Sequence, residues 1–287
     1  MNLYKGKTVR IEDYITSSII RFGGLRDYIQ EKMMVDYFAI QGNLGIARGI
    51  KIYIQNQKSR LESVDQIQIL DIGPAIGAIT GMLILQELGR ANPALLKKAK
   101  LILLDVSERV IEQTQSRNFL FPDAMIGPEF KSEILTKLRT SKGIVTSCHE
   151  LPIKSDSIDI CAAGFLFHHL HDGIKKASAQ EIQRVLRPGG FVGVAEEWFE
   201  NYEDYRAIHA HDEIPLAYES IISSRRLRLM FPNLEIFESK NPSGKGTGEN
   251  YYYFCGIKKK TLGIGPRTIS GNFTEIVGGL FFLIRIS

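Results

Sequence analysis

The 287-residue sequence has only three cysteines, one tryptophan and no strong excess of either charge. Cys148, Cys161 and Cys255 are far apart and form no CxxC pair, which argues against a disulfide framework and against a zinc site. We therefore expect reduced thiols and a cytoplasmic location. The net charge of +4 is much weaker than a dedicated nucleic-acid-binding domain usually carries, so we expect no nucleic-acid partner.

Long hydrophobic runs are also missing. The opening residues MNLYKGKTVRIEDY contain no apolar segment of the kind found in secretory signals. A bilayer span needs about 20 apolar residues, and the nearest stretch, IVGGLFFLIRI near the C-terminus, is too short. We expect no transmembrane segment. The apolar tail is expected to dock on its own domain or on a partner chain, as in a homodimer, with contact to a lipid substrate or membrane surface as the alternative.

From Ile67 onward, short apolar runs alternate with amphipathic segments of helical spacing. The runs IQILDI, LILLD, SIDICAAGFLF and GFVGVAEEW are nearly continuous, as in strands covered on both faces. This alternation predicts an α/β fold with a doubly wound, mostly parallel sheet and helices on both faces. LEIFES and YYYFCGIK can add an antiparallel hairpin at the end of the sheet. We expect a helical N-terminal segment (1–64) over the substrate side, a sheet domain (65–260) and a C-terminal tail (261–287).

The segment LDIGPAIGAITG, residues 70–81, places a glycine-containing bend after the first of these strands. Glycine lets ligand atoms approach the backbone, and ligands of open α/β sheets bind outside the carboxyl ends of the strands. Asp105 ends the next strand, where an acid can accept both hydroxyls of a ribose. Its alternative role, compatible with the first, is that of an acid at the N-terminus of the following helix. Dinucleotide-dependent dehydrogenases share these features, so the bend alone does not identify the ligand.

Five segments in order identify the ligand more narrowly: ILDIGPAIG, LLDVS, LPIKSDSIDIC, FHHL and VLRPGG, within about residues 67–197. In these the sequence resembles the class I S-adenosylmethionine-dependent methyltransferases, in particular the ubiquinone/menaquinone-type small-molecule branch. The resemblance implies a Rossmann-like seven-stranded sheet with an antiparallel last strand, and S-adenosyl-L-methionine as cofactor. It also implies in-line methyl transfer to a small-molecule or lipid-like acceptor. The alternative is a catalytically silent, methyltransferase-like binding or assembly protein.

The resemblance also implies which residues bind the cofactor. The glycine-containing bend would contact the methionine part of the cofactor, and the second strand would contact its ribose and adenine. The segment before LP would contact the edge of the adenine. The fourth strand would run past the cofactor toward the substrate. These residues are Asp71, Gly73, Pro74, Ala75 and Gly77 in the bend, Asp105 and Val106, Ser147 and Cys148, and Gly164.

Two of these positions depart from the family pattern. Ala75 replaces the middle glycine of the bend, and Ser147 replaces the usual acid before LP. Alanine fits the bend where φ is negative, and serine can still hydrogen-bond an adenine amine, although without charge assistance. We therefore expect cofactor binding to survive in weakened form. The silent-protein alternative rests on these same two departures.

His168 and His169 follow the fourth strand and are the best candidates for a general base, since the imidazole pKa suits proton transfer near neutrality. Alternatively, they pack and hydrogen-bond between a strand and a helix. A base is needed only where the acceptor must lose a proton, because the cofactor itself is reactive. Glu196 and Glu197 end the fifth strand, where they either orient a polar acceptor or begin the next helix.

Two clusters remain in the charged region after Trp198, which we expect to be helical to about Arg228. HAHDE, residues 209–213, has the residue types of a metal site, but two histidines spaced by two do not share a helix face. We expect a solvated helix face or pocket wall there, and no metal. The arginines of SSRRLRLMF could meet an anionic substrate or a membrane surface, although such short clusters are usually solvated. They are Arg225, Arg226 and Arg228.

Overall fold

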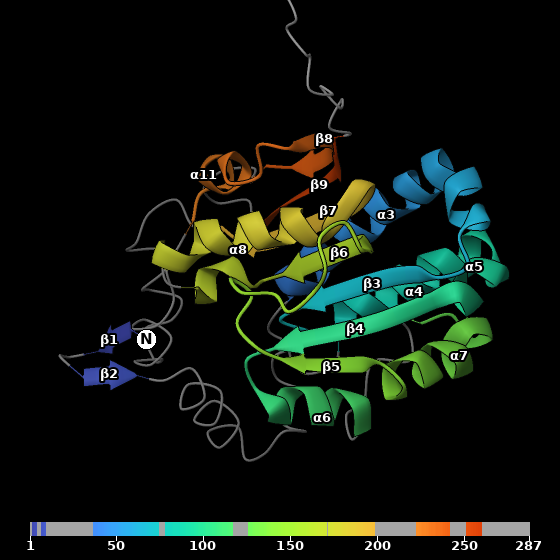
Figure 1. Ribbon diagram of the computed structural model, residues 1–287, viewed down its shortest axis with the longest axis horizontal. Coiled ribbons are helices and arrows are strands. Elements are labelled where there is room, and N and C mark those ends of the chain that lie inside the picture. Colours follow the sequence, from blue (N-terminus) through green and yellow to red (C-terminus); the bar gives the residue numbers. More distant parts are fainter. Residues whose placement is uncertain are drawn as a thin grey trace, which may run out of the picture.

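The computed structural model of the chain describes eight stretches. They are residues 2–4, 7–9, 37–74, 78–116, 126–170, 172–198, 222–241 and 251–259. Figure 1 shows a central sheet with helices in front of it and behind it. The strands of this sheet are β3 (Ile67–Ile72), β4 (Ala99–Asp105), β5 (Lys142–Val145), β6 (Ile158–Gly164), β7 (Leu186–Glu197), β8 (Leu234–Lys240) and β9 (Tyr251–Lys258).

The seven strands lie in the order β5-β4-β3-β6-β7-β9-β8. Neighbouring strands are parallel except that β9 runs antiparallel to both β7 and β8. The predicted doubly wound, mostly parallel sheet with an antiparallel last strand is therefore confirmed, and so is the terminal hairpin of β8 and β9. In this order, β4 and β5 extend from one side of β3, whereas β6 and β7 extend from the other.

Helices cover both faces of this sheet. On one face lie α3 (Tyr37–Ser63), α4 (Ile79–Ala91), α5 (Pro93–Lys98) and α7 (Pro128–Arg139), and on the other lie α8 (Asp172–Val185) and α11 (Ser224–Leu229). The helix α6 (Glu108–Ser116) packs beside β4 and β5. Ile69 packs with the first layer and Leu70 with the second. Because both faces are buried, the strand sequences are continuously apolar.

The N-terminal residues differ in part from the helical segment expected for 1–64. β1 (Asn2–Tyr4) and β2 (Lys7–Val9) form an antiparallel pair, whereas the helix α3, from Tyr37, agrees with the expectation; residues 10–36 lie outside the described stretches. The helical spacing used for the prediction lies in residues 23–40, so it carries no information about the first nine. A two-residue connection containing Gly6 is short enough for a hairpin turn.

A buried ion-pair network joins the end of α3 to the sheet. Asp159 in β6 is fully buried, and its Oδ1 lies 2.8 Å from Nη2 of Arg60 and 3.1 Å from Nη1 of Arg187. Its Oδ2 accepts a hydrogen bond from the backbone N–H of Gln68 at 2.9 Å. This carboxylate thus links α3, β3, β6 and β7 at the amino-terminal end of the parallel strands.

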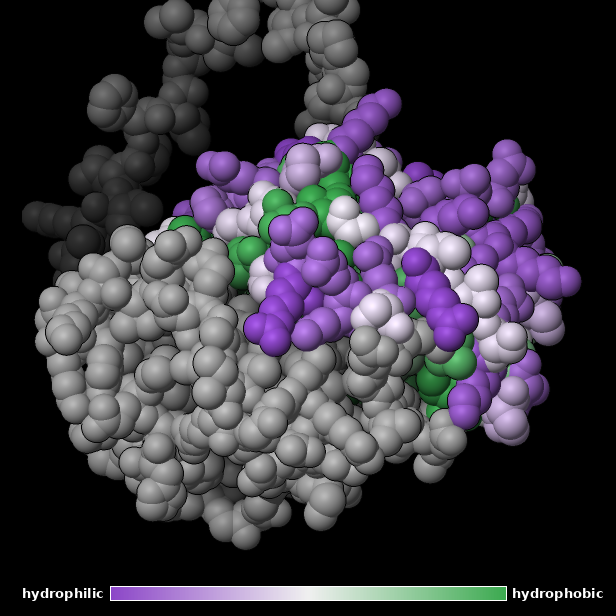
Figure 2. Space-filling view, turned by 90° about the horizontal axis from the view of Figure 1, so that it is seen from below, coloured by the Kyte–Doolittle hydropathy of each residue, from purple (hydrophilic) through white to green (hydrophobic). Residues whose placement is uncertain are grey.

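The three cysteines are buried and none is in a disulfide, as expected. Within the described stretches, no helix combines the length and apolar character needed to cross a membrane. Figure 2 views the molecule from below and shows mainly hydrophilic side chains, with small apolar patches between them, over the described part of that face.

Candidate functional site

The candidate site lies where the strand order reverses, between the carboxyl ends of β3 and β6. Ligands of doubly wound sheets bind outside this point, because the loops after the two strands leave in opposite directions. Asp71 lies near the end of β3, Asp105 ends β4 and Gly164 ends β6. The sheet thus brings three of the predicted site residues to neighbouring strand ends.

Asp71 is a buried carboxylate with one unsatisfied oxygen. Its side chain is 1% exposed, and Oδ2 accepts a hydrogen bond from the backbone N–H of Gly81 in α4 at 2.9 Å. Its Oδ1 is also buried and has no hydrogen-bond partner among the described residues. Burial raises the pKa of Asp71 to about 7, and the neighbouring Asp105 charge adds to this while the Gly81 bond opposes it. Such an oxygen is suited to accept a hydrogen bond from a cationic ligand.

The bend after β3 requires a glycine at its first position. Gly73 has a φ of +63°, and its N–H donates to the carbonyl of Leu104 at 2.8 Å. A Cβ there would lie 2.9 Å from Cδ1 of Leu166. Pro74 is buried beside it, and the backbone carbonyl of Pro74 accepts from Ala78 N–H at 3.1 Å. The predicted contacts of Ala75 and Gly77 lie outside the described residues.

Asp105 occupies both positions considered for it, at a strand end and at a helix start. Its Oδ1 accepts from the backbone N–H of Ser107 at 2.9 Å, so it supports the beginning of α6. Burial raises the pKa of Asp105 to about 6, against the effect of backbone hydrogen bonds from Ser107 and Val106. Val106 follows, half-buried. The structural role is thus observed, and a ribose contact through Asp105 remains a prediction compatible with it.

Ser147 and Cys148 follow β5, next to the Asp105 strand end. The backbone N–H of Thr146 donates to the carbonyl of Asp105 at 2.9 Å, which holds the two loops together. The hydroxyl of Ser147 lies 2.6 Å from Nδ1 of His149. The buried thiol of Cys148 donates to the hydroxyl of Ser178 at 3.2 Å, and burial raises the pKa of this thiol. The Cys148 side chain therefore belongs to the core, and only its backbone is suited to the predicted adenine contact.

Gly164 lies under a polar contact between α3 and α4 that the sequence did not suggest. The hydroxyl of Thr80 donates to Oδ1 of Asn43 at 2.8 Å, and both side chains are buried. A Cβ on Gly164 would lie 2.8 Å from the Thr80 hydroxyl and even closer to Oδ1 of Asn43. The only signal for this contact is a single polar residue in each of two otherwise small or apolar segments, GNLG and AITGM.

The two candidate bases lie in the short helix η2 (Phe167–His169) after β6. Glu196, fully buried in β7, accepts hydrogen bonds from the backbone N–H of Phe167 and lies 2.7 Å from Nδ1 of His168. The ring centroids of His168 and His169 are 3.9 Å apart. Glu196 therefore fixes this turn instead of beginning a helix, and β7 continues through Glu197.

The residues of HAHDE, which are His209, His211, Asp212 and Glu213, lie outside the described part of the chain. Among the residues that are described, no group of three or more His, Cys, Asp and Glu side chains is arranged to hold a metal ion.

Part of the chain is similar to a known family. Residues 70–194 match the methyltransferase domain family. The matched segment begins in β3 and ends in β7, so it contains the Asp71 bend, Asp105, Gly164 and the two histidines. The match covers less than half of the chain. A search of curated protein sequences gives no match.

Several solved structures are similar to this chain. The CurJ carbon methyltransferase is 14% identical with a TM-score of 0.48, over 74% of this chain and 54% of that one. NodS, an N-methyltransferase from Bradyrhizobium japonicum WM9 in complex with S-adenosyl-L-homocysteine, is 14% identical with a TM-score of 0.45, over 72% and 88%. The PH0226 protein from Pyrococcus horikoshii OT3 is 13% identical with a TM-score of 0.45, over 72% and 89%. The strand order described above, and not these similarities, carries the fold assignment.

Proposed function

We propose that this chain is an S-adenosylmethionine-dependent methyltransferase acting on a small-molecule or lipid-like acceptor, in the manner of the ubiquinone/menaquinone-type enzymes. One observation carries the proposal: within the methyltransferase domain, the buried Oδ1 of Asp71 has no partner among the described residues. A buried carboxylate oxygen without a partner costs free energy, and a cationic ligand can offset that cost. S-adenosylmethionine carries an ammonium and a sulfonium group, so the site fits its charge.

The predicted cofactor residues can hold the other parts of this molecule. The backbone of Gly73 and Pro74 lies beside Asp71 and suits close approach of the methionine part. The Asp105 carboxylate suits the ribose hydroxyls, and Val106 offers an apolar contact for the adenine. Ser147 and the Cys148 backbone would lie at the adenine edge, and Gly164 on the side facing the acceptor.

When bound, S-adenosylmethionine supplies an activated methyl group, so the protein's task is to align the acceptor and exclude water. Where the acceptor must lose a proton, His168 and His169 are the proposed bases. A His168 tautomer that donates its Nδ1–H to Glu196 places the lone pair on Nε2, which is the form that accepts a proton. Glu196 thereby orients His168 through Nδ1.

Calorimetric titration with S-adenosylmethionine and S-adenosylhomocysteine tests the cofactor assignment. We expect binding of both, and we expect Asp105→Ala to weaken it about tenfold or more, because a carboxylate hydrogen bond contributes roughly 1.5–3 kcal/mol. Asp156→Asn is the control, since Asp156 is an exposed acid just before the amino-terminal end of β6, opposite the carboxyl ends that form the site, and pairs with Lys258 at 2.7 Å. Absence of binding at millimolar cofactor, or equal affinity in Asp105→Ala, would contradict the proposal.

Transfer of a labelled methyl group tests the reaction itself. Incubation with methyl-labelled cofactor and a panel of small phenols, quinols, amines and thiols should label one acceptor class. His169→Ala should lower turnover of a proton-losing acceptor with little change in cofactor affinity. Tight cofactor binding without transfer to any acceptor would instead favour the catalytically silent alternative.

A further inference from the structure

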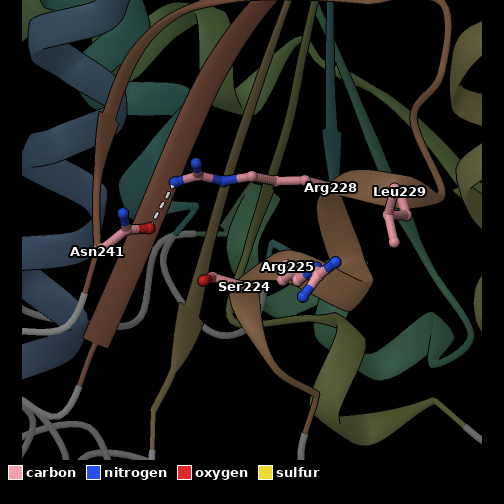
Figure 3. Close-up of a pocket in the computed structure, with 5 residues that line it drawn as sticks. All are labelled: Ser224, Arg225, Arg228, Leu229 and Asn241. Atoms are coloured by element: carbon pink, nitrogen blue, oxygen red, sulfur yellow. Dashed lines mark hydrogen bonds between the residues drawn. The ribbon is translucent and has the colours of Figure 1, made fainter.

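A pocket of about 410 Å³ lies between α11 and the end of β8, outside the segment that matches the methyltransferase domain. Figure 3 shows Arg228 extending across it from α11 toward Asn241, the residue after β8, with Arg225 one turn earlier on the helix. The residues that line it are Ser224, Arg225, Arg228, Leu229 and Asn241.

The two arginines of this pocket have no acidic partner among the described residues. Nη2 of Arg228 donates to Oδ1 of Asn241 at 2.9 Å, the bond drawn dashed in Figure 3. Nε of Arg228 is buried and has no hydrogen-bond partner among the described residues. Among those residues, no carboxylate forms an ion pair with Arg225 or Arg228, whereas Arg226 on the same helix lies 3.8 Å from Asp172. Within the described part of the chain, the positive charges on the pocket side of α11 are thus left without a compensating carboxylate, whereas that of Arg226 has one.

Hydrogen bonds and apolar packing fix the position of α11 and therefore the shape of the pocket. The side chain of Ser223 accepts from Arg226 N–H at the start of α11, and Leu227 is buried beneath it. The hydroxyl of Tyr252 donates to the carbonyl of Ile222 at 2.8 Å, which ties the approach to α11 to β9. The Arg228 guanidinium also lies over the Phe254 ring, 5.9 Å from its centroid. An arginine held in this way loses little freedom when it binds a ligand.

We infer that this pocket binds a small molecule through a phosphate or carboxylate group. Guanidinium N–H groups match the geometry of such oxyanions, so Arg225 and Arg228 can donate charge-assisted hydrogen bonds to the ligand. The Ser224 hydroxyl and the Asn241 amide add neutral polar groups. Leu229, 73% exposed beside them, suits an apolar part of the same molecule. The volume lies at the small end of the range for ligand pockets.

Titration of the ¹⁵N-labelled full chain with inorganic phosphate, and separately with acetate, tests this inference at constant ionic strength. We expect saturable shifts of the Arg228 Nε–H resonance and of the Ser224 and Asn241 amides with at least one probe. Arg228→Gln and Arg225→Gln should each weaken binding about tenfold, since each removes a charge-assisted contact. Arg226→Gln removes the same charge from the same helix and should leave binding unchanged.

The inference is overturned if neither probe gives saturable shifts, or if Arg226→Gln weakens binding as much as Arg225→Gln. Arg225 is exposed, so its replacement keeps the test valid even if Arg228→Gln fails to fold. Sedimentation with phosphatidylglycerol vesicles separates the two sources of a phosphate group: binding to vesicles without binding of free phosphate would overturn the small-molecule assignment. None of these residues belongs to the proposed cofactor site, so the result is independent of S-adenosylmethionine binding.

Discussion

Gly164 shows how one residue can set the distance between a helix and a strand end. The Asn43 and Thr80 side chains meet directly above its Cα, in the space that a Cβ would occupy. Phe165 follows with a φ of +58°, and its N–H donates to the carbonyl of Ala195 at 2.7 Å. A non-glycine residue in this conformation is strained, and such strain gathers at functional sites. The absence of a side chain at 164 therefore keeps α3 and α4 close to the proposed acceptor side.

Replacing Gly164 with alanine should lower the free energy of unfolding by about 1–3 kcal/mol, the usual cost of overpacking a buried site. Urea unfolding measures this loss. Asn43→Ala alone should cost about 1 kcal/mol, the value of one buried hydrogen bond. Because Asn43→Ala also removes the nearest obstacle to the new methyl group, the double variant should be more stable than the sum of the two losses predicts. Strictly additive losses would contradict the steric explanation.

At the scale of elements, the two ends of α3 are held in place by different interactions. Its 27 residues include Gln57 at φ −114° and ψ 17°, where the helix is kinked. Beyond this kink, Arg60 donates to the Tyr53 hydroxyl at 2.7 Å and to the carbonyl of Gly189 at 2.8 Å. The last turns of α3 are thus held by the Asp159 network, whereas its earlier turns are held by apolar packing on β7 and β9.

Replacing Asp159 with asparagine should destabilise the fold by about 3 kcal/mol, because it removes the fully buried carboxylate that pairs with the half-buried Arg60 and Arg187. The midpoint of guanidinium unfolding, with an unchanged slope, would report this loss. Asp156→Asn is the matched control: that acid is 54% exposed in its ion pair with Lys258, and asparagine tolerates its positive φ of 54°. The control should change stability by less than about 1 kcal/mol. Equal effects of the two substitutions would show that the network contributes no more than a surface pair.

For the molecule as a whole, the sequence predicts the elements that depend on a local pattern of apolar residues or glycines. Continuous apolar runs identify the strands because both faces of this sheet are covered, and the bend after Asp71 is identified by its glycines. The contact of Asn43 with Thr80 and the hold of Glu196 on His168 join residues 37 and 28 positions apart, and no local pattern encodes them. The strands β1 and β2 were missed because three-residue strands carry too short a pattern. The Asn43–Thr80 and Glu196–His168 contacts are determined by the tertiary fold and not by local propensity.

The pH dependence of stability should report on two acids of the candidate site, Asp71 and Asp105. Their pKa values in the folded chain are raised by burial to about 7 and about 6, from 3.8. Between pH 3.8 and these raised values, the folded state binds more protons than the unfolded state. The stabilisation by the two protonated carboxyls is therefore complete below about pH 4 and is lost as the pH rises through 6 to 7.

We therefore expect the free energy of unfolding of the cofactor-free chain to fall by on the order of 4 kcal/mol between pH 5 and pH 8 through these two groups. Asp71→Asn should remove most of this fall, because the amide stays neutral throughout. S-adenosylmethionine should act in the opposite direction, since a cation binds the ionised carboxylates and its affinity should rise over the same interval. Urea unfolding at both pH values, with and without cofactor, measures both effects. If the parent chain and Asp71→Asn show the same pH dependence, the Asp71 carboxyl is ionised in the folded chain even at pH 5, and it cannot link cofactor binding to pH.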